Sequence, residues 1–218
     1  MKPLRILVAD DHDLVRRGVK SILQAHPGWE VCAEATTGRE AVIKAKELKP
    51  DIAILDIGMP EMNGLDAART IQRDLPETEI LILSMHHSDQ LIRELVDIGV
   101  RGYIVKSDSD RDLIVAVENL ANHNPFFTTK VTDFLIGSFN STEPLRKDLD
   151  SIPRRITPRE REIVQLLAEG RSSKEVASIL GISVKTAETH RSNVMRKLKI
   201  HTISELVLYA LRNQIVEA

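Results

Sequence analysis

Four short apolar runs, each followed by a polar residue, constrain the fold of this chain most strongly. The runs are Ile6–Ala9, Ile52–Leu55, Ile80–Leu83 and Tyr103–Val105, and the residues that follow them are Asp10 with Asp11, Asp56, Ser84 and Lys106. Each run has the length and side-chain branching of a strand, and helix-like stretches separate the runs. This alternation predicts parallel strands joined by right-handed crossovers, with all four endings at one ligand-binding edge of one sheet.

The polar residues at this edge suit a divalent cation and a phosphoryl group. Clustered carboxylates repel one another, and Mg²⁺ relieves the repulsion because it prefers oxygen ligands. Asp56 is then a candidate nucleophile that forms an acyl phosphate. Lys106 would neutralise charge on the transferring oxygens, and the Ser84 hydroxyl would donate a hydrogen bond to the phosphoryl group. Any one of these residues is equally well explained as a solvated loop residue, but one at each successive strand end is not.

Residues 1–121 are predicted to form five strand–helix pairs. The predicted strands are Arg5–Ala9, Glu30–Ala35, Asp51–Leu55, Glu79–Leu83 and Gly102–Val105. The predicted helices are Leu14–Ala25, Gly38–Lys46, Asn63–Arg73, Gln90–Ile98 and Asp110–Asn119. A small sheet of this kind with helices on both faces is a flavodoxin-like (βα)5 fold of the α/β class.

The charge balance differs between the two parts of the chain. Residues 150–218 hold 12 Lys and Arg against 8 Asp and Glu, a net charge of +4, whereas residues 1–149 hold 18 against 24, a net charge of −6. A polyanionic partner is therefore expected only for the C-terminal part, although +4 alone would not establish one.

The sequence indicates a cytoplasmic protein without a membrane partner. No apolar run is long enough to cross a bilayer, and the N-terminus lacks a signal-peptide pattern. The single cysteine, Cys32, excludes an internal disulfide framework and fits a reducing compartment.

Residues 122–155 are predicted to be a linker, because prolines interrupt a weak pattern. The apolar residues of this segment are compatible with one short amphipathic helix that packs on a neighbour; they are Phe126, Phe127, Phe134, Leu135 and Phe139.

Residues 156–218 are predicted to form a small all-α unit of four helices. Serine and threonine caps mark the helix starts at Thr157, Ser172, Ser183 and Thr202. Gly181 ends the second helix, and two helices joined by a glycine-containing turn form a helix-turn-helix.

The third of these helices is predicted to be amphipathic and to lie in the major groove of DNA. Its core-facing residues would be Val184, Ala187, Val194 and Leu198. The candidate DNA-binding residues are Arg191, Arg196 and Lys197 for phosphates, Lys185, Glu188, Thr189 and Ser192 for base edges, and Thr186. The alternative is a charged face that only contacts solvent.

Four motifs carry a family resemblance in the first unit: VADDH at residues 8–12, DIGMPEMNGL at 56–65, LSM at 83–85 and GYIVK at 102–106. Residues 1–121 thereby resemble the receiver domain of bacterial two-component response regulators. The resemblance implies that a sensor histidine kinase phosphorylates Asp56. It also implies that Mg²⁺ is held by Asp11, Asp56 and the backbone carbonyl of Gly58, with Asp10 acting nearby or through water.

The same resemblance implies that Ser84 and Tyr103 form a switch pair. Phosphorylation would draw Ser84 inward, and the Tyr103 ring would follow into the vacated space. Without the resemblance, Tyr103 is better explained as a half-buried strand aromatic. His86 is expected in a loop, where it would tune the access of water to the phosphoryl group.

The C-terminal unit also resembles a known family. The motifs are ITPRERE at residues 156–162, LAEG at 167–170, KEVA at 174–177 and LGISVKT at 180–186, and they resemble the LuxR-type helix-turn-helix domain. The chain is thereby identified as a member of the NarL/FixJ subfamily of response regulators. The resemblance implies a phosphorylation-switched transcription factor that binds double-stranded promoter DNA as a homodimer.

Two other functions remain open on the sequence. A phosphatase of the haloacid-dehalogenase type also uses an aspartyl nucleophile, but it needs a second acid two residues later, where this chain has Gly58. We therefore expect no enzyme activity beyond Mg²⁺-dependent self-phosphotransfer and autodephosphorylation at Asp56. An interaction adaptor whose last helices bind protein is the second alternative.

Overall fold

The computed structural model describes residues 2–85, 89–107, 110–128, 131, 156–213 and 215–216, of which 89 and 90 are described by their backbone alone. The chain divides into two units, residues 1–137 and 138–218. His86 and His87 lie outside the described residues, as do Phe134, Leu135, Phe139 and the rest of 132–155, so the expectations for them stay predictions.

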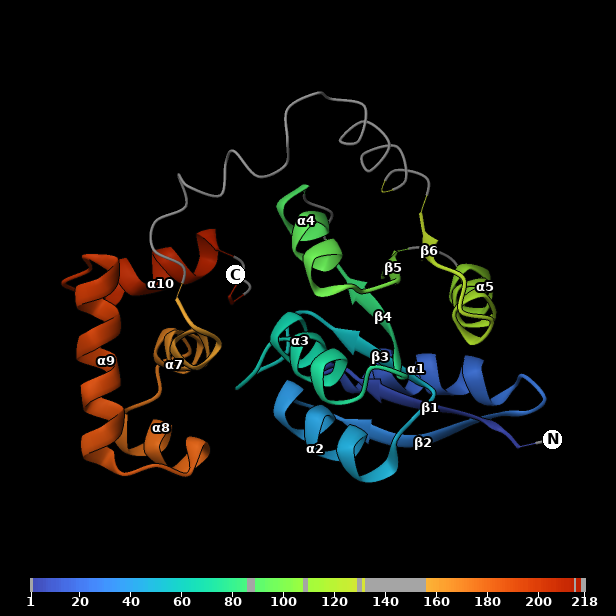
Figure 1. The fold of residues 1–218 in the computed structure, drawn as a ribbon, viewed down its shortest axis with the longest axis horizontal. Coiled ribbons are helices and arrows are strands. Elements are labelled where there is room, and N and C mark those ends of the chain that lie inside the picture. The colour runs from blue at the N-terminus through green and yellow to red at the C-terminus, as the bar shows by residue number, and fades with distance from the viewer. Residues whose placement is uncertain are drawn as a thin grey trace. The chain divides into compact units, whose positions relative to one another are not determined.

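A parallel six-stranded sheet forms the centre of the first unit (Figure 1). The strands are β1 (Leu4–Ala9), β2 (Trp29–Ala35), β3 (Ile52–Asp56), β4 (Glu79–Ser84), β5 (Gly102–Val105) and β6 (Phe126–Phe127). Their order is β2-β1-β3-β4-β5-β6, and all adjacent pairs are parallel. The order reverses between β1 and β3, which places a ligand crevice at the carboxyl ends of these two strands.

Helices cover both faces of this sheet. They are α1 (Asp13–Gln24), α2 (Gly38–Leu48), α3 (Gly64–Asp74), α4 (Asp89–Ile98) and α5 (Asp110–Ala121). Side chains of β1 alternate between two apolar cores: Ile6 and Val8 pack with α1 and α5, whereas Leu7 and Ala9 pack with α2 and α3. Burial on both faces explains why the strands read as continuous apolar runs. The predicted flavodoxin-like fold class is confirmed.

One segment differs from its prediction. Phe126 and Phe127 form the strand β6, which pairs with Gly102 and Tyr103 of β5, and they do not belong to a helix. A two-residue strand has no detectable period, and its pairing depends on the exposed edge of β5 rather than on its own sequence. The sheet therefore extends beyond residue 121.

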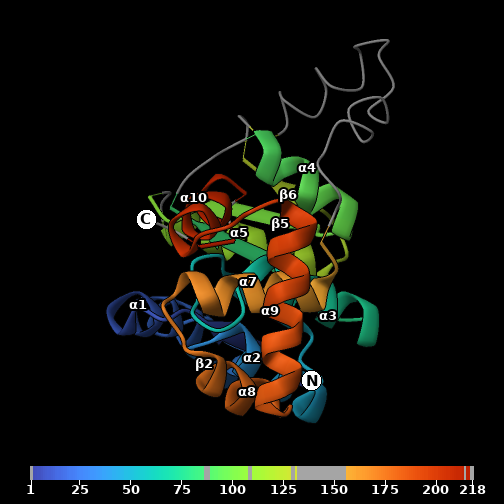
Figure 2. The ribbon, with the colours of Figure 1, turned by 90° about the vertical axis from the view of Figure 1, so that its left-hand side faces the viewer.

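The C-terminal unit contains α7 (Pro158–Ala168), α8 (Ser173–Leu180), α9 (Val184–Leu198) and α10 (Ile203–Arg212). Figure 2 shows α9 as a long helix with α7 and α8 packed against it. The caps are Thr157, Ser172, Ser183 and Thr202, and each accepts a hydrogen bond from the third helical residue. Gly181 ends α8 in the left-handed conformation that favours glycine.

The core-facing side of α9 agrees in part with its prediction. Ala187 and Val194 are buried in the core of this unit, and Leu198 packs against it. Val184, the first residue of the helix, is exposed, so the prediction that it faces the core is wrong.

Candidate functional site

The carboxyl ends of β1, β3 and β5 bring three charged side chains into one buried cluster. The Lys106 Nζ atom lies 2.8 Å from Asp10 Oδ2 and 2.9 Å from Asp56 Oδ1. Both carboxylates are buried, as is most of the lysine side chain. The crossover topology positions these groups, because Asp56 ends one strand of the sheet while Asp10 and Lys106 each follow another.

The charge state of Lys106 follows from its two partners. Burial by itself disfavours the ammonium form, but the hydrogen bonds and charges of Asp10 and Asp56 outweigh burial and raise the pKa of Lys106 above its usual value. The lysine is therefore a permanent cation, and it offsets part of the repulsion between the two acids.

Four candidate ligand atoms lie beside this cluster. One side-chain atom each of Asp10, Asp11, His12 and Asp56 lies within 4.8 Å of the others. Asp11 is exposed, and its Oδ1 atom is 2.8 Å from His12 Nδ1, while the amide of His12 donates to Asp10 Oδ1 at 2.8 Å. An acidic cluster rich in carboxylate oxygen fits a hard divalent cation such as Mg²⁺ better than a soft one.

The other sequence-predicted residues of this unit surround the cluster. Gly58 is half-buried in the turn between β3 and α3. Ser84 is buried at the end of β4, and its carbonyl accepts a hydrogen bond from the Lys106 amide at 2.7 Å. Tyr103 is fully buried in the core on the α2–α4 face, so it is not a half-exposed strand aromatic.

Arg16 is an additional contact that the motifs do not include. Its guanidinium donates to the backbone carbonyl of Asp10 at 2.8 Å and to Asp13 Oδ1 at 2.7 Å. The spacing of Arg16 three residues after Asp13 is a sequence signal for the ion pair with Asp13, but not for the contact with the Asp10 carbonyl.

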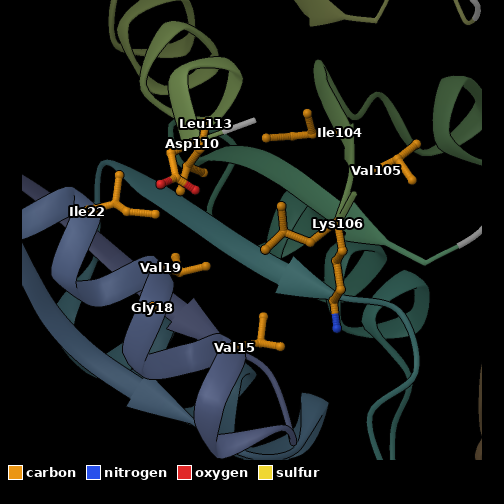
Figure 3. A pocket seen from close by; sticks show the side chains of 10 residues that line it. Val15, Gly18, Val19, Ile22, Ile104, Val105, Lys106, Asp110 and Leu113 are labelled. Carbon is orange, nitrogen blue, oxygen red and sulfur yellow. The ribbon is translucent and has the colours of Figure 1, made fainter. Parts of the chain in front are cut away.

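A cavity of about 180 Å³ lies beside the cluster, between α1, the ends of β4 and β5, and the start of α5 (Figure 3). Its lining is mostly aliphatic and includes Val15, Val19, Ile104 and Leu113. The stem of Lys106 lines the cavity, while its ammonium points away from Asp110 (Figure 3). The cavity carries little polar chemistry of its own.

The candidate DNA-binding residues fall into two groups on α9. Exposed side chains are those of Lys185, Thr186, Glu188, Thr189, Ser192 and Arg196, and Arg191 is half-buried. Lys197 forms the second group, because it is half-buried and its Nζ atom lies 2.7 Å from Glu160 Oε2 at the start of α7. Lys197 thus fastens α9 to α7.

We expect Glu160→Gln to destabilise the C-terminal unit by about 1 kcal/mol at pH 7, the size of a partly buried charged hydrogen bond. Burial would raise the pKa of Glu160, but hydrogen bonds from Lys197 and Thr157 hold it below the usual 4.5. The stabilisation of the C-terminal unit by ionised Glu160 is therefore present above pH 4.5, and it is lost as the pH falls through the lowered pKa of Glu160. Urea unfolding followed by circular dichroism at pH 7 and pH 3.5 measures this.

Glu205→Gln is the control, since Glu205 closes the same type of capping box, at Thr202, and its described contacts do not include a cation of another helix. A loss equal to that of Glu160→Gln would contradict the role of the Lys197 ion pair.

None of the helices in the described part of the chain combines the length and the apolar character needed to cross a membrane.

Two family profiles match the two units. The family described as "Response regulator receiver domain" matches residues 6–118, and the family described as "Bacterial regulatory proteins, luxR family" matches residues 154–210. The first match contains the acidic cluster and Lys106, and the second contains the helix-turn-helix.

Relatives match over almost the entire chain. The oxygen regulatory protein NreC of Staphylococcus epidermidis is 38% identical over 98% of this chain and 100% of its own length. The transcriptional regulatory protein MctR of Rhizobium johnstonii is 37% identical over 98% of this chain and 95% of its own. The solved structure of the response regulator ChrA, from a heme-sensing two-component system, has a TM-score of 0.53 at 27% identity, over 99% of this chain and 100% of that one. The chain therefore belongs to the two-component response regulators of the NarL/FixJ subfamily, in which a receiver domain is joined to a LuxR-type DNA-binding domain.

Proposed function

We propose that phosphorylation of Asp56 by a cognate sensor histidine kinase switches this response regulator into a homodimer that binds promoter DNA. The observation that carries the proposal is the buried Lys106 ammonium, 2.8 Å from Asp10 and 2.9 Å from Asp56 at the carboxyl edge of the sheet. A cation fixed at this place stabilises a neighbouring group that gains negative charge. Conversion of the Asp56 carboxylate into an aspartyl phosphate adds such charge.

We assign the cation site to Asp11, Asp56 and the carbonyl of Gly58, with Asp10 acting nearby or through water. The carboxylate-rich donor set around Asp10, Asp11 and Asp56 supports Mg²⁺ as the cofactor. When bound, Mg²⁺ would supply charge neutralisation for the oxygens of the phosphoryl group.

In the transfer step, an oxygen of the Asp56 carboxylate attacks the phosphorus of a phosphohistidine on the kinase. The new P–O bond forms as the P–N bond breaks, and the electron pair of that bond leaves with the imidazole, which takes up a proton. Lys106 stays protonated throughout, because its raised pKa lies far above neutrality, and it attracts the phosphoryl oxygens. Water then hydrolyses the acyl phosphate, which is the only turnover we propose for this chain.

For the switch, Ser84 would donate a hydrogen bond to the phosphoryl group. Ser84 ends β4, and its carbonyl is bonded to the amide of Lys106, so a small shift of this residue would pull on β5 directly. Tyr103 on β5 is already buried in the structure. We therefore propose that phosphorylation holds the Tyr103 ring in this buried position rather than driving it inward.

For DNA binding, α9 would enter the major groove with its exposed face toward the bases. Lys185, Thr186, Glu188, Thr189 and Ser192 are the proposed base-edge and groove contacts, and Arg191 and Arg196 are the proposed phosphate contacts. Lys197 contributes to DNA binding only indirectly, through the ion pair with Glu160 that fastens α9 to α7. The proposed domain limits are 1–121, extended by the strand β6, and 156–218, with a linker between them. The proposed location is the cytoplasm, because the partners are a kinase and DNA.

The test compares DNA affinity with and without beryllofluoride, a mimic of the aspartyl phosphate, on a duplex selected from random DNA. We expect about tenfold tighter binding with the mimic, which is a typical coupling between two sites, together with a doubling of mass in light scattering. Asp56→Asn should show neither change. Equal affinity and equal mass in both conditions would contradict the switch, and binding that barely depends on salt would favour the protein adaptor.

A further inference from the structure

Arg16 contacts the backbone of the loop that carries the acidic pair, whereas Lys106 contacts the carboxylate of Asp10. The loop spans residues 10–12, between the end of β1 and the start of α1. The Arg16 Nη1 atom donates to the backbone carbonyl of Asp10 at 2.8 Å, and its Nη2 atom donates to Asp13 Oδ1 at 2.7 Å. Only 12% of the Arg16 side chain is exposed, so the surrounding structure fixes its guanidinium in place.

The same guanidinium ties this loop to the neighbouring strand. Its Nε atom lies 3.5 Å from Glu34 Oε2 on β2. Glu34 is itself held, because its carboxylate pairs with Lys20 of α1 and its carbonyl accepts from Lys44 Nζ of α2 at 2.6 Å. Arg16 therefore joins three elements at the point where β1 ends.

The bond that the Asp10 carbonyl accepts in the described part of the chain comes from Arg16, and the other described bonds of the loop involve other atoms. His12, the residue before α1, makes no side-chain capping bond to the helix. Besides the bond from Arg16, the described bonds of the Asp10 and His12 backbone are the Asp10 amide to the Ala35 carbonyl at 3.1 Å, the His12 amide to Asp10 Oδ1 at 2.8 Å, and the His12 carbonyl to the Arg16 amide at 3.0 Å. The Arg16 side chain is thus a main determinant of where the Asp10 carbonyl lies.

We propose that Arg16 is a positioning residue for the divalent cation: by fixing the backbone at Asp10 it aims the carboxylates of Asp10 and Asp11 at the cation site. This inference rests on the proposed Mg²⁺ site and adds a residue to it. Arg16 touches neither the phosphoryl group nor the cation, and it acts through the loop alone. Arginine suits this role because its planar fork holds several acceptors at once, whereas lysine is a single point charge.

The charge of Arg16 and its positioning role predict opposite effects of its removal on the affinity for Mg²⁺. A guanidinium repels Mg²⁺, so on charge alone its removal would tighten Mg²⁺ binding. On position, removal would loosen the loop and weaken Mg²⁺ binding by about tenfold or more, as is typical when a residue that orients a metal ligand is lost.

The chain offers a matched control. Arg17 carries the same charge one residue later on α1, but its side chain is 74% exposed and its described ion pair is with Asp13 Oδ2 at 2.9 Å. Arg17→Gln therefore removes a comparable charge without releasing the Asp10 carbonyl. Arg16→Lys keeps the charge and loses the fork, and it also serves if Arg16→Gln folds poorly.

The experiment titrates MgCl2 into the full-length protein by isothermal titration calorimetry, without a phosphodonor, below the unfolding temperature of every variant. We expect Arg16→Gln and Arg16→Lys to bind Mg²⁺ about tenfold more weakly and Arg17→Gln to stay within about twofold. Amide resonances of residues 10–13 should shift in metal-free Arg16→Lys, while those of α3 should not.

Three results would overturn the proposed role of Arg16. Mg²⁺ binding by Arg16→Gln or Arg16→Lys that equals or exceeds that of the wild type would overturn the role of Arg16 and leave the proposed function intact. Equal weakening in Arg17→Gln would also overturn it, because the effect would then be one of charge. A wild type that binds no Mg²⁺ would overturn both the cation site and this inference.

Discussion

We expect Asp56→Asn to take up no phosphoryl group from acetyl phosphate and Mg²⁺, whereas the wild type should gain about 80 Da, the mass of one phosphoryl group. The side-chain amide of asparagine is a far weaker nucleophile than the carboxylate that it replaces. The substitution keeps the shape of the side chain and removes one of two buried acids around a single lysine, so it leaves the fold intact. Intact-protein mass spectrometry measures the adduct.

Asp74→Asn is the control for this experiment. Asp74 ends α3 and pairs with Lys46 and Arg73, and these contacts lie outside the acidic cluster. This variant should gain the same mass as the wild type. An adduct that persists in Asp56→Asn would remove the basis of the proposed function.

Gly64→Ala should destabilise the receiver unit by about 3 kcal/mol or more, at the upper end of overpacking effects. A Cβ atom at Gly64 would lie 2.0 Å from the backbone oxygen of Asp56. The Gly64 amide also donates to the Ile57 carbonyl at 3.0 Å, so the start of α3 is fastened to the end of β3. Backbone atoms cannot swing aside as a flexible side chain can, and the strand end must therefore move. Urea unfolding gives the free energy.

The same clash involves the backbone of Asp56, the proposed phosphoryl acceptor, so phosphoryl uptake by the folded fraction of Gly64→Ala should fall as well. Gly18→Ala is the matched control, because a Cβ atom at Gly18 in α1 meets nothing within 4 Å. In a helix interior alanine is favoured over glycine by up to about 1 kcal/mol, so this variant should be as stable as the wild type or more stable. A Gly64→Ala protein whose stability is within about 1 kcal/mol of the wild type, the size of an ordinary point-mutation effect, would show that the turn is more adaptable than its contacts indicate.

Local sequence patterns predicted the elements of this fold well. The predicted strand Gly102–Val105 is the observed β5, and the helix caps at Thr157, Ser172, Ser183 and Thr202 begin the observed helices of the C-terminal unit. These signals are short-range, since period, capping and glycine turns depend on residues within one or two helical turns. β6 has no such signal, because a pair of phenylalanines becomes a strand only when a partner edge is available.

The sequence by itself determined that acids, a hydroxyl and a lysine would gather at one edge of the sheet, because strand order and crossover handedness follow from the alternation of elements. Only the tertiary structure decided how they meet. The bridge from Lys106 to both Asp10 and Asp56, the hold of Arg16 on the Asp10 carbonyl, and the pairing of Lys197 with Glu160 across 37 residues all depend on side-chain directions in the packed molecule. Local periodicity assigns a residue to a face, whereas the partner that it finds there is fixed by the packing of elements distant in the chain.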